Sequence, residues 1–219
     1  MSINLEKYNQ IKEELEGKAT LVAVSKTKPV EDIKALYDLG HRDFGENYVQ
    51  ELVDKQAQLP KDIRWHFIGH LQSNKVKFIA PFIHLIHAID SISLLKEIDK
   101  QAEKANRIID LLLQVYIAKE ETKFGLSDHE LQAIIPQLPA FKNVSVKGLM
   151  GMASFTNDMR KARAEFHHLK NLYHTLTIHD SRFTILSMGM SSDYHEALHE
   201  GTNMVRIGSL LFGEREYQK

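Results

Sequence analysis

The chain has 219 residues, a net charge of −1 and a pI of about 6.9. Proteins that bind nucleic-acid duplexes normally carry a basic excess, so this balance argues against nucleic acid as a partner. The chain has no cysteine, which excludes disulfides, thiolate metal sites and cysteine nucleophiles. No stretch is apolar enough to span a membrane, and the first seven residues lack the apolar core of a signal peptide, so we expect a cytoplasmic protein.

Short apolar runs alternate with amphipathic stretches along the chain, beginning with a predicted helix over about residues 5–15. We predict eight strands, over residues 21–26, 43–45, 65–69, 85–90, 110–116, 144–150, 185–190 and 204–207. Repeated strand–helix units predict a parallel sheet. Eight units without a linker predict a closed (β/α)8 barrel of the TIM type, forming one domain over residues 1–219. The alternative is an open doubly wound sheet, which usually carries a glycine-rich turn where this chain has Thr27-Lys28-Pro29.

Lys26 closes the first predicted strand and is the first candidate for chemistry. In α/β barrels the loops after the strands build the active face. Partial burial at such a position favours the neutral, nucleophilic form of an amine. A lysine of this kind often holds an aldehyde cofactor as a Schiff base. The alternative interpretation is a surface lysine that happens to end a strand.

The loops after the last two predicted strands indicate a phosphate site. Ser191 and Ser192 follow the seventh strand, and Gly208 and Ser209 follow the eighth. Phosphate sites in barrels often form from these two loops and a nearby helix N-terminus, which offers free N–H groups. Taken singly, each loop favours a structural interpretation, with Ser191 and Ser192 as helix caps and Gly208 as a turn residue. The presence of both loops after the two expected strands favours a phosphate site. Arg206 lies near the end of the eighth strand and needs an acceptor, for which we expect a ring nitrogen, a carboxylate or a structural ion pair.

Residues 195–199 match the H-E-x-x-H pattern of zinc proteases. The predicted helix that carries them is short, and Ala197 and Leu198 form its apolar face. The two histidines are therefore expected to face solvent, and no third ligand follows on a supporting helix. We expect no metal here, and a zinc hydrolase is the alternative.

Six segments that run in order along nearly the whole chain resemble the pyridoxal phosphate homeostasis protein family. They are residues 21–29 (LVAVSKTKP), 44–51 (FGENYVQE), 65–75 (WHFIGHLQSNK), 148–150 (GLM), 186–191 (LSMGMS) and 205–209 (VRIGS) with Phe212-Gly213. The resemblance implies a barrel similar to the N-terminal domain of alanine racemase, the fold-type III arrangement, with pyridoxal 5'-phosphate as its cofactor. One departure is Tyr116, which stands where the family often has asparagine.

The resemblance also assigns roles to residues of the chain. It implies that Lys26 holds the cofactor as a Schiff base and that Arg206 lies close to the cofactor, at its ring nitrogen in one interpretation. It implies that Asn47 lines the site. The residues implied at the cofactor phosphate are Ser191, Ser192, Gly208 and Ser209.

The resemblance implies a protein that maintains the vitamin B6 pool rather than one that turns over a substrate. The chain ends at Lys219, which leaves no room for the second, β-rich domain of the related racemases. A racemase also needs two acid/base groups, and beside Lys26 only Tyr48 and Tyr116 come into question. We therefore expect a non-catalytic, monomeric protein that supplies pyridoxal phosphate to apo-enzymes. The alternative is a small amino-acid racemase or lyase that depends on pyridoxal phosphate.

Overall fold

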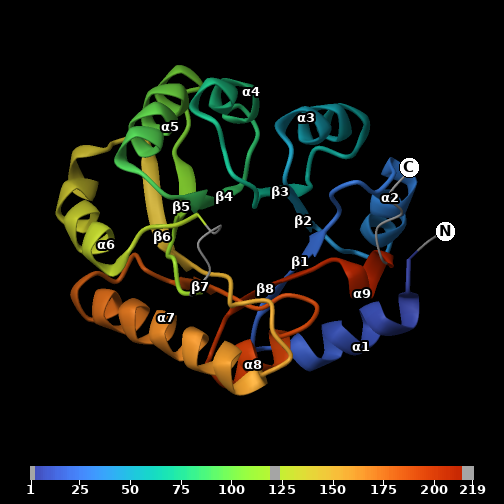
Figure 1. The fold of residues 1–219 in the computed structure, drawn as a ribbon. Coiled ribbons are helices and arrows are strands. Elements are labelled where there is room, and N and C mark those ends of the chain that lie inside the picture. Colours follow the sequence, from blue (N-terminus) through green and yellow to red (C-terminus); the bar gives the residue numbers. More distant parts are fainter. Residues whose placement is uncertain (1–2, 119–123, 214–219) are drawn as a thin grey trace.

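A closed barrel of eight parallel strands forms the centre of the molecule, and the strands follow one another around it in chain order (Figure 1). The computed structural model describes residues 3–118 and 124–213. The strands are β1 (Thr20–Val24), β2 (Asp43–Glu46), β3 (Arg64–Phe67), β4 (Leu85–Ile89), β5 (Ile109–Gln114), β6 (Val144–Met150), β7 (Ile185–Ser187) and β8 (Met204–Ile207). The predicted barrel is confirmed. The open-sheet alternative is wrong, because β1 pairs with both β2 and β8.

Helices surround the barrel on its outside (Figure 1). They are α1 (Leu5–Leu15), α2 (Val30–Asp38), α3 (Val49–Gln58), α4 (Val76–Ile79), α5 (Ile92–Lys104), α6 (Asp128–Ile134), α7 (Met159–His179), α8 (Tyr194–His199) and α9 (Ser209–Phe212), with 3-10 turns at Ser73–Lys75 and Ile135–Ala140. The predicted first helix is confirmed at its predicted ends. The side chain of Asn4 accepts the Lys7 N–H at 3.0 Å and so caps this helix.

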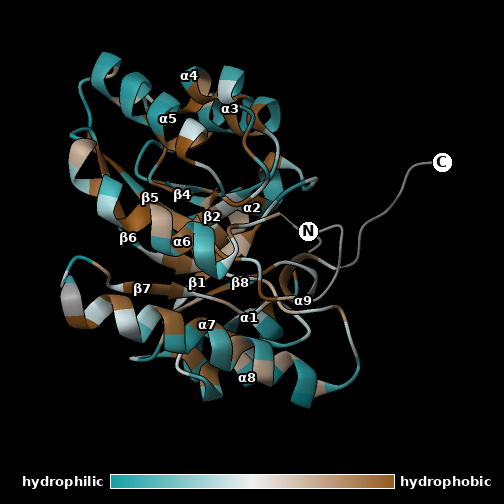
Figure 2. Cartoon of the chain, turned by 60° about the vertical axis from the view of Figure 1, so that its left-hand side comes forward, coloured by the Kyte–Doolittle hydropathy of each residue, from teal (hydrophilic) through white to brown (hydrophobic). Residues whose placement is uncertain are grey.

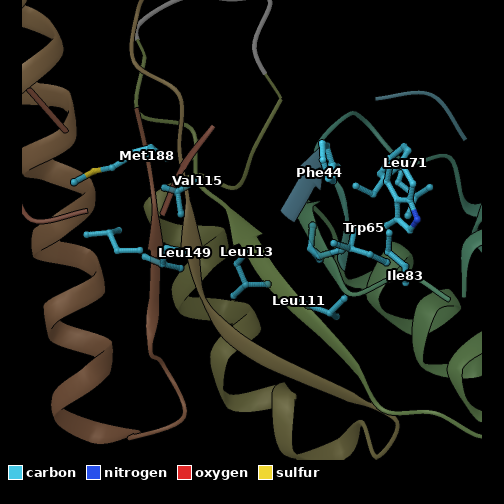
Figure 3. Close-up of a cluster of buried hydrophobic side chains, with 14 of the residues drawn as sticks. Phe44, Trp65, Leu71, Ile83, Leu111, Leu113, Val115, Leu149 and Met188 are labelled. Atoms are coloured by element: carbon cyan, nitrogen blue, oxygen red, sulfur yellow. The ribbon is translucent and has the colours of Figure 1, made fainter. Parts of the chain in front are cut away.

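The strands bury side chains on both faces, in two separate apolar clusters. The larger cluster lies between the strands and the outer helices. Figure 3 shows Leu111 and Leu113 of β5 in it, with Val115 just after that strand and Leu149 and Met188 nearby. The smaller cluster draws Val22, Leu85, Leu112, Met150 and Met204 from five different strands. Successive side chains of a strand point to opposite faces, so this second set fills the barrel interior.

Hydropathy follows the same arrangement. Apolar residues concentrate on the strands and on the inner faces of the helices, while the outer faces are hydrophilic (Figure 2). Among the described residues, no helix combines the length and the apolar character that crossing a membrane would require.

The barrel closes where β1 meets β8. Four residues of β1, from Thr20 to Ala23, pair in register with four of β8, from Met204 to Ile207. Helix α1 covers this seam from outside, and the Asn4 N–H donates to the Leu211 carbonyl of α9 at 2.8 Å. Residues from the two ends of the sequence therefore lie side by side in the fold.

Candidate functional site

A cavity of about 420 Å³ opens at the carboxyl ends of the strands. This volume falls in the range of about 300–1,000 Å³ that is typical of small-molecule sites. The structure brings every predicted binding residue to the wall of this cavity: Lys26, Asn47, Ser191, Ser192, Arg206, Gly208 and Ser209. They come from the ends of β1, β2, β7 and β8, which are far apart in the sequence and adjacent around the barrel.

The alternation of β1 aims Lys26 into the cavity. Val22 packs in the barrel interior, and Val24 lines the cavity above it. Lys26 is two residues further along and lies on the same face. The neighbouring Lys28 also lines the cavity, but its Nζ donates to the carbonyl of Phe212 at 2.8 Å. We take Lys26 as the candidate for the reactive amine because it continues the inward face of β1.

The turn that carries Lys26 has a strained backbone. Thr27 has φ +63°, a left-handed conformation that costs a β-branched residue roughly 1–2 kcal/mol. The turn is closed by the Lys28 N–H, which donates to the Ser25 carbonyl at 3.0 Å. The Thr27 N–H donates to Glu51 Oε1 at 2.6 Å, which stabilises the strained residue from helix α3. Strain of this kind often accompanies functional positions.

A buried ionic cluster supports this turn from behind. Lys55 Nζ donates to Glu46 Oε1 at 2.8 Å, to Glu51 Oε1 at 2.6 Å and to the Ser25 carbonyl at 2.8 Å. The Ser25 hydroxyl donates to Glu46 Oε1 at 2.7 Å. Glu46 is fully buried and its Oε2 has no hydrogen-bond partner among the described residues. Burial raises the pKa of Glu46 to about 7, although Lys55 opposes the shift.

Replacing Glu46 with glutamine is expected to flatten the dependence of stability on pH. The folded pKa of about 7 lies above the usual 4.5, so the folded protein binds more protons than the unfolded chain between these values. The free energy of unfolding therefore falls as pH rises from about 4.5 to about 7, by about 3 kcal/mol at most. Urea denaturation at several pH values measures this slope. The exposed Glu103→Gln serves as control, and parallel curves for parent and Glu46→Gln would refute the expectation.

The two loops implied at a phosphate lie against each other. The Gly208 N–H donates to Ser191 Oγ at 3.2 Å, which joins the loops after β7 and β8. Gly208 and Ser209 begin helix α9, whose first N–H groups have no acceptor within the helix. Gly189 has φ +94°, and a Cβ there would lie 2.7 Å from that of Ala197, so the approach to α8 requires glycine.

Arg206 is buried in the wall of the cavity. Its guanidinium donates to Ser187 Oγ at 2.6 Å and to the Gly151 carbonyl at 2.9 Å. Both of these acceptors are uncharged, whereas the Asp193 carboxylate attracts the guanidinium and opposes the lowering of its pKa. Burial lowers the pKa of Arg206 to about 10, so the group remains a cation at neutral pH.

Asn47 offers the cavity an unused acceptor. Its Oδ1 is buried and has no hydrogen-bond partner among the described residues. A Cβ at Gly69 would lie 2.4 Å from the Asn47 carbonyl, so glycine lets the loop after β3 close over this residue. Buried polar groups are nearly always satisfied, and a donor on a bound molecule would satisfy this one.

Other residues of the cavity wall were not predicted, among them Ile68, Met152, Phe155 and Met190. Met190 stands beside predicted residues, and Phe155 is an exposed aromatic in a polar loop, which is a detectable signal. The two tyrosines considered as acid/base groups do not line the cavity. Tyr48 is 56% exposed, and Tyr116 lies beside the smaller space near Phe124.

In the structure, the segment with the H-E-x-x-H motif contacts helix α1 instead of forming a metal site. His195 Nε2 lies 3.2 Å from Glu14 Oε2 of α1, and the Tyr194 hydroxyl donates to the same oxygen at 2.8 Å. His199 is exposed. These contacts attach α8 to α1 and do not assemble a set of ligands.

Accordingly, we expect no metal at this motif. Elemental analysis of the purified protein should find no zinc that depends on His199, and treatment with a chelator should leave ligand binding unchanged. His199→Ala should alter the free energy of unfolding by less than about 0.5 kcal/mol, as is usual for surface positions. A tightly held metal that is lost in His199→Ala would revive the hydrolase interpretation.

Comparison with known proteins places the chain in a family. Residues 5–216 match the model of the alanine racemase N-terminal domain. The pyridoxal phosphate homeostasis protein of Synechocystis sp. is 39% identical over 211 residues, which cover 95% of this chain and 97% of the relative. The chain belongs to the pyridoxal phosphate homeostasis protein family.

Solved structures agree with this family assignment. PipY of Synechococcus elongatus, with PLP bound, superposes with a TM-score of 0.88 at 37% identity, covering 95% of this chain and 99% of PipY. Alanine racemase from Bartonella henselae superposes with a TM-score of 0.70 at 19% identity, covering 92% of this chain and 56% of the racemase. The second likeness concerns the fold alone. The family and the fold that the sequence motifs imply are thus confirmed.

Proposed function

We propose that this protein binds pyridoxal 5'-phosphate in the cavity at the carboxyl ends of the strands, maintains the cellular pool of that cofactor and supplies it to apo-enzymes. The observation that carries the proposal is the convergence of a strand-end amine, two donor-rich loops and a buried cation on one cavity. The family of pyridoxal phosphate homeostasis proteins and the PLP-bound structure of PipY support it.

The residues present fit this cofactor. When bound, pyridoxal phosphate supplies an aldehyde that condenses reversibly with primary amines. Lys26 is the amine we assign to that aldehyde, and Ser191, Ser192, Gly208 and Ser209 are assigned to the phosphate. Hydroxyl and backbone N–H donors at a helix start suit a dianion. The unused Oδ1 of Asn47 and the Arg206 guanidinium are the groups that would contact the ring of the cofactor.

The wall of the cavity argues for a carrier rather than a catalyst. The described residues that line it include no carboxylate, histidine or tyrosine, whereas racemisation needs a second proton-transferring group. Phe155, which lines the mouth, is 91% exposed, so solvent has access to the cavity. An open site weakens electrostatic stabilisation of a transition state. It also lets the bound aldehyde exchange onto another amine.

Reactivation of an apo-enzyme tests this function. The loaded protein is mixed with an apo pyridoxal phosphate enzyme, and recovery of that enzyme's activity is followed while a scavenger removes free cofactor. We expect recovery from the loaded protein. The control is the same protein after borohydride reduction, which fixes the cofactor to its lysine and should supply nothing. Equal results from both samples would contradict the proposal.

Amino-acid turnover tests the absence of catalysis. The loaded protein is incubated with a panel of L-amino acids in heavy water, and exchange of the α-proton is followed. We expect negligible exchange with every amino acid. Rapid, stereospecific racemisation or decarboxylation of one substrate that is lost in Lys26→Ala would establish the enzyme alternative. The proposal also includes a cytoplasmic location and a monomeric state, which cell fractionation and light scattering test.

A further inference from the structure

A line of buried polar side chains runs through the barrel interior, away from the candidate cofactor cavity. It begins at Arg206, which donates to Ser187 Oγ at 2.6 Å. Ser187 Oγ lies 3.5 Å from His87 Nδ1, and His87 Nε2 lies 2.9 Å from His66 Nδ1. His66 Nε2 lies 3.0 Å from Asp43 Oδ1. All five residues are buried.

The line ends at a second cavity at the other end of the barrel. This cavity measures about 670 Å³ and is lined at the amino ends of the strands by Asp43, Arg64, His66 and His84, among others. Arg64 donates to both carboxylate oxygens of Asp43. The line of five residues therefore joins a buried cation in one cavity to a buried anion in the other.

With neutral imidazole rings, one arrangement of protons satisfies every group in the line. Arg206 can only donate and the Asp43 carboxylate can only accept, which fixes the direction at both ends. His66 then donates from Nε2 to Asp43 and accepts at Nδ1 from His87 Nε2–H. His87 Nδ1 accepts from the Ser187 hydroxyl. Every donor points from Arg206 toward Asp43.

Barrel interiors are usually filled by branched apolar side chains, and burying polar groups is costly unless each is satisfied. Two imidazoles and a hydroxyl in this position therefore call for an explanation beyond filling space. Hydrogen bonds in series polarise one another, so each link strengthens the next in a low-dielectric interior. Such a line restricts the orientation of the group at its end, which here is the guanidinium in the wall of the cofactor cavity.

We propose that Ser187 and His87 are positioning residues for Arg206, and that the line through His66 couples the guanidinium in the cofactor cavity to Asp43 at the opposite end of the barrel. The role of Arg206 toward pyridoxal phosphate rests on the proposed function, whereas the arrangement of the line does not. Burial holds the pKa of His87 well below its usual value, which agrees with a neutral ring.

Several charged groups face the line and matter for its response to pH. His87 is faced by His66, His84 and Arg206, and Arg206 is itself faced by Asp193. At the far end, His66 packs against the ring of His84, and the charges around His84 include Asp43, Arg64 and Asp110. Burial lowers the pKa of His84. His84 makes ring contact with His66 but is not a link in the line, so it provides a matched control.

Nitrogen NMR of the histidine rings tests the line without any ligand. In the unliganded protein we expect His87 to stay neutral and to carry its proton on Nε2 from about pH 6 to 8, against an ordinary histidine pKa of about 6.5. The neutral ring of His66 should likewise carry its proton on Nε2. A proton on His87 Nδ1 would overturn the proposed direction. This outcome does not depend on whether the protein binds pyridoxal phosphate.

Variants loaded with pyridoxal phosphate test the coupling. Ser187→Ala removes an acceptor of a charged donor, for which we expect about tenfold weaker cofactor binding. His87→Phe breaks the longest link, for which we expect about threefold weaker binding. The positive charge of a guanidinium held against the ligand disfavours protonation of the ligand. A less firmly held Arg206 should therefore raise the pH midpoint of the change in the visible spectrum, by about 0.5 unit for a threefold change in the protonation equilibrium.

Two further variants separate positioning from simple packing. His87→Gln can accept from Ser187 and donate to His66, so we expect it to restore the parent affinity and midpoint. His84→Gln should change neither. If His87→Phe folds and keeps the parent midpoint, or if Ser187→Ala binds the cofactor as the parent does, the coupling is refuted. If the proton positions are as expected but the parent captures no pyridoxal phosphate, the proposed function fails and the line through the barrel stands.

Discussion

Replacing Lys26 with alanine is expected to abolish covalent capture of pyridoxal phosphate, so that the purified variant is colourless where the parent is yellow. Lys26 follows the end of β1 by two residues, on the same side as Val22 and Val24, and lines the cavity together with the donor-rich loops. Among the described residues of the cavity wall, Lys28 is the other amine, and its Nζ donates to the Phe212 carbonyl at 2.8 Å. Visible absorbance and mass spectrometry after borohydride reduction measure the loss.

Peptide mapping of the reduced parent identifies the lysine directly. We expect the adduct on Lys26. The matched control is Lys28→Ala, which removes the neighbouring lysine of the cavity wall and should retain the adduct. An adduct found on Lys28 or on Lys75, in the loop after β3, and absent from Lys26 would contradict the assignment.

The second large effect is expected from the phosphate loops. Changing Ser192 and Ser209 together to alanine removes two hydroxyl donors from adjacent loops of the cavity wall. Hydrogen bonds to charged groups contribute about 1.5–3 kcal/mol each, so the pair should weaken cofactor binding by about 100-fold or more. Equilibrium ultrafiltration of the variant and the parent measures the change.

Two comparisons make this expectation specific to the phosphate. Ser93→Ala, an exposed serine at the start of α5, should bind the cofactor as the parent does. Pyridoxal without its phosphate should bind the parent weakly and lose little further affinity in the double variant. Equal binding of pyridoxal and pyridoxal phosphate to the parent would show that the loops have another role.

The outline of the barrel could be predicted from the sequence because strand–helix repetition is a local pattern. The predicted ends are less accurate where the chain leaves the sheet within an apolar run. The seventh strand was predicted to reach residue 190, whereas β7 ends at Ser187. Gly189, with φ +94°, turns the chain out of the sheet although Met188 and Met190 on either side are apolar.

The seven predicted binding residues converge because parallel strands in a closed barrel bring all their carboxyl ends together. That argument needs only the order of the strands. The ionic cluster of Glu46, Glu51 and Lys55 was not predicted, because it depends on how α3 rotates against β2. The spacing of four residues between Glu51 and Lys55 on one helix would have indicated their ion pair, but not the contact with Glu46.

The pairing of His66 with His87 also escaped prediction. The two residues are 21 positions apart and lie on neighbouring strands β3 and β4. A single buried histidine in an apolar strand is not informative by itself. Its partner is determined by the register between strands, which cannot be deduced from the hydrophobic pattern of either one.

The seam between β1 and β8 has a consequence for how the protein is made. Thr20 and Met204 lie at opposite ends of the sequence, so closing the barrel carries a large loop-closure entropy and is expected to be a late and slow event in folding. Lys26 stands on one side of this seam, and Arg206 and Ser209 stand on the other. On the ribosome, Lys26 emerges long before Ser209, yet its cavity cannot exist until Ser209 has followed. A chain that is still being synthesised therefore lacks the loop after β8 and cannot hold the cofactor tightly. Only a chain whose barrel has closed is expected to carry bound cofactor.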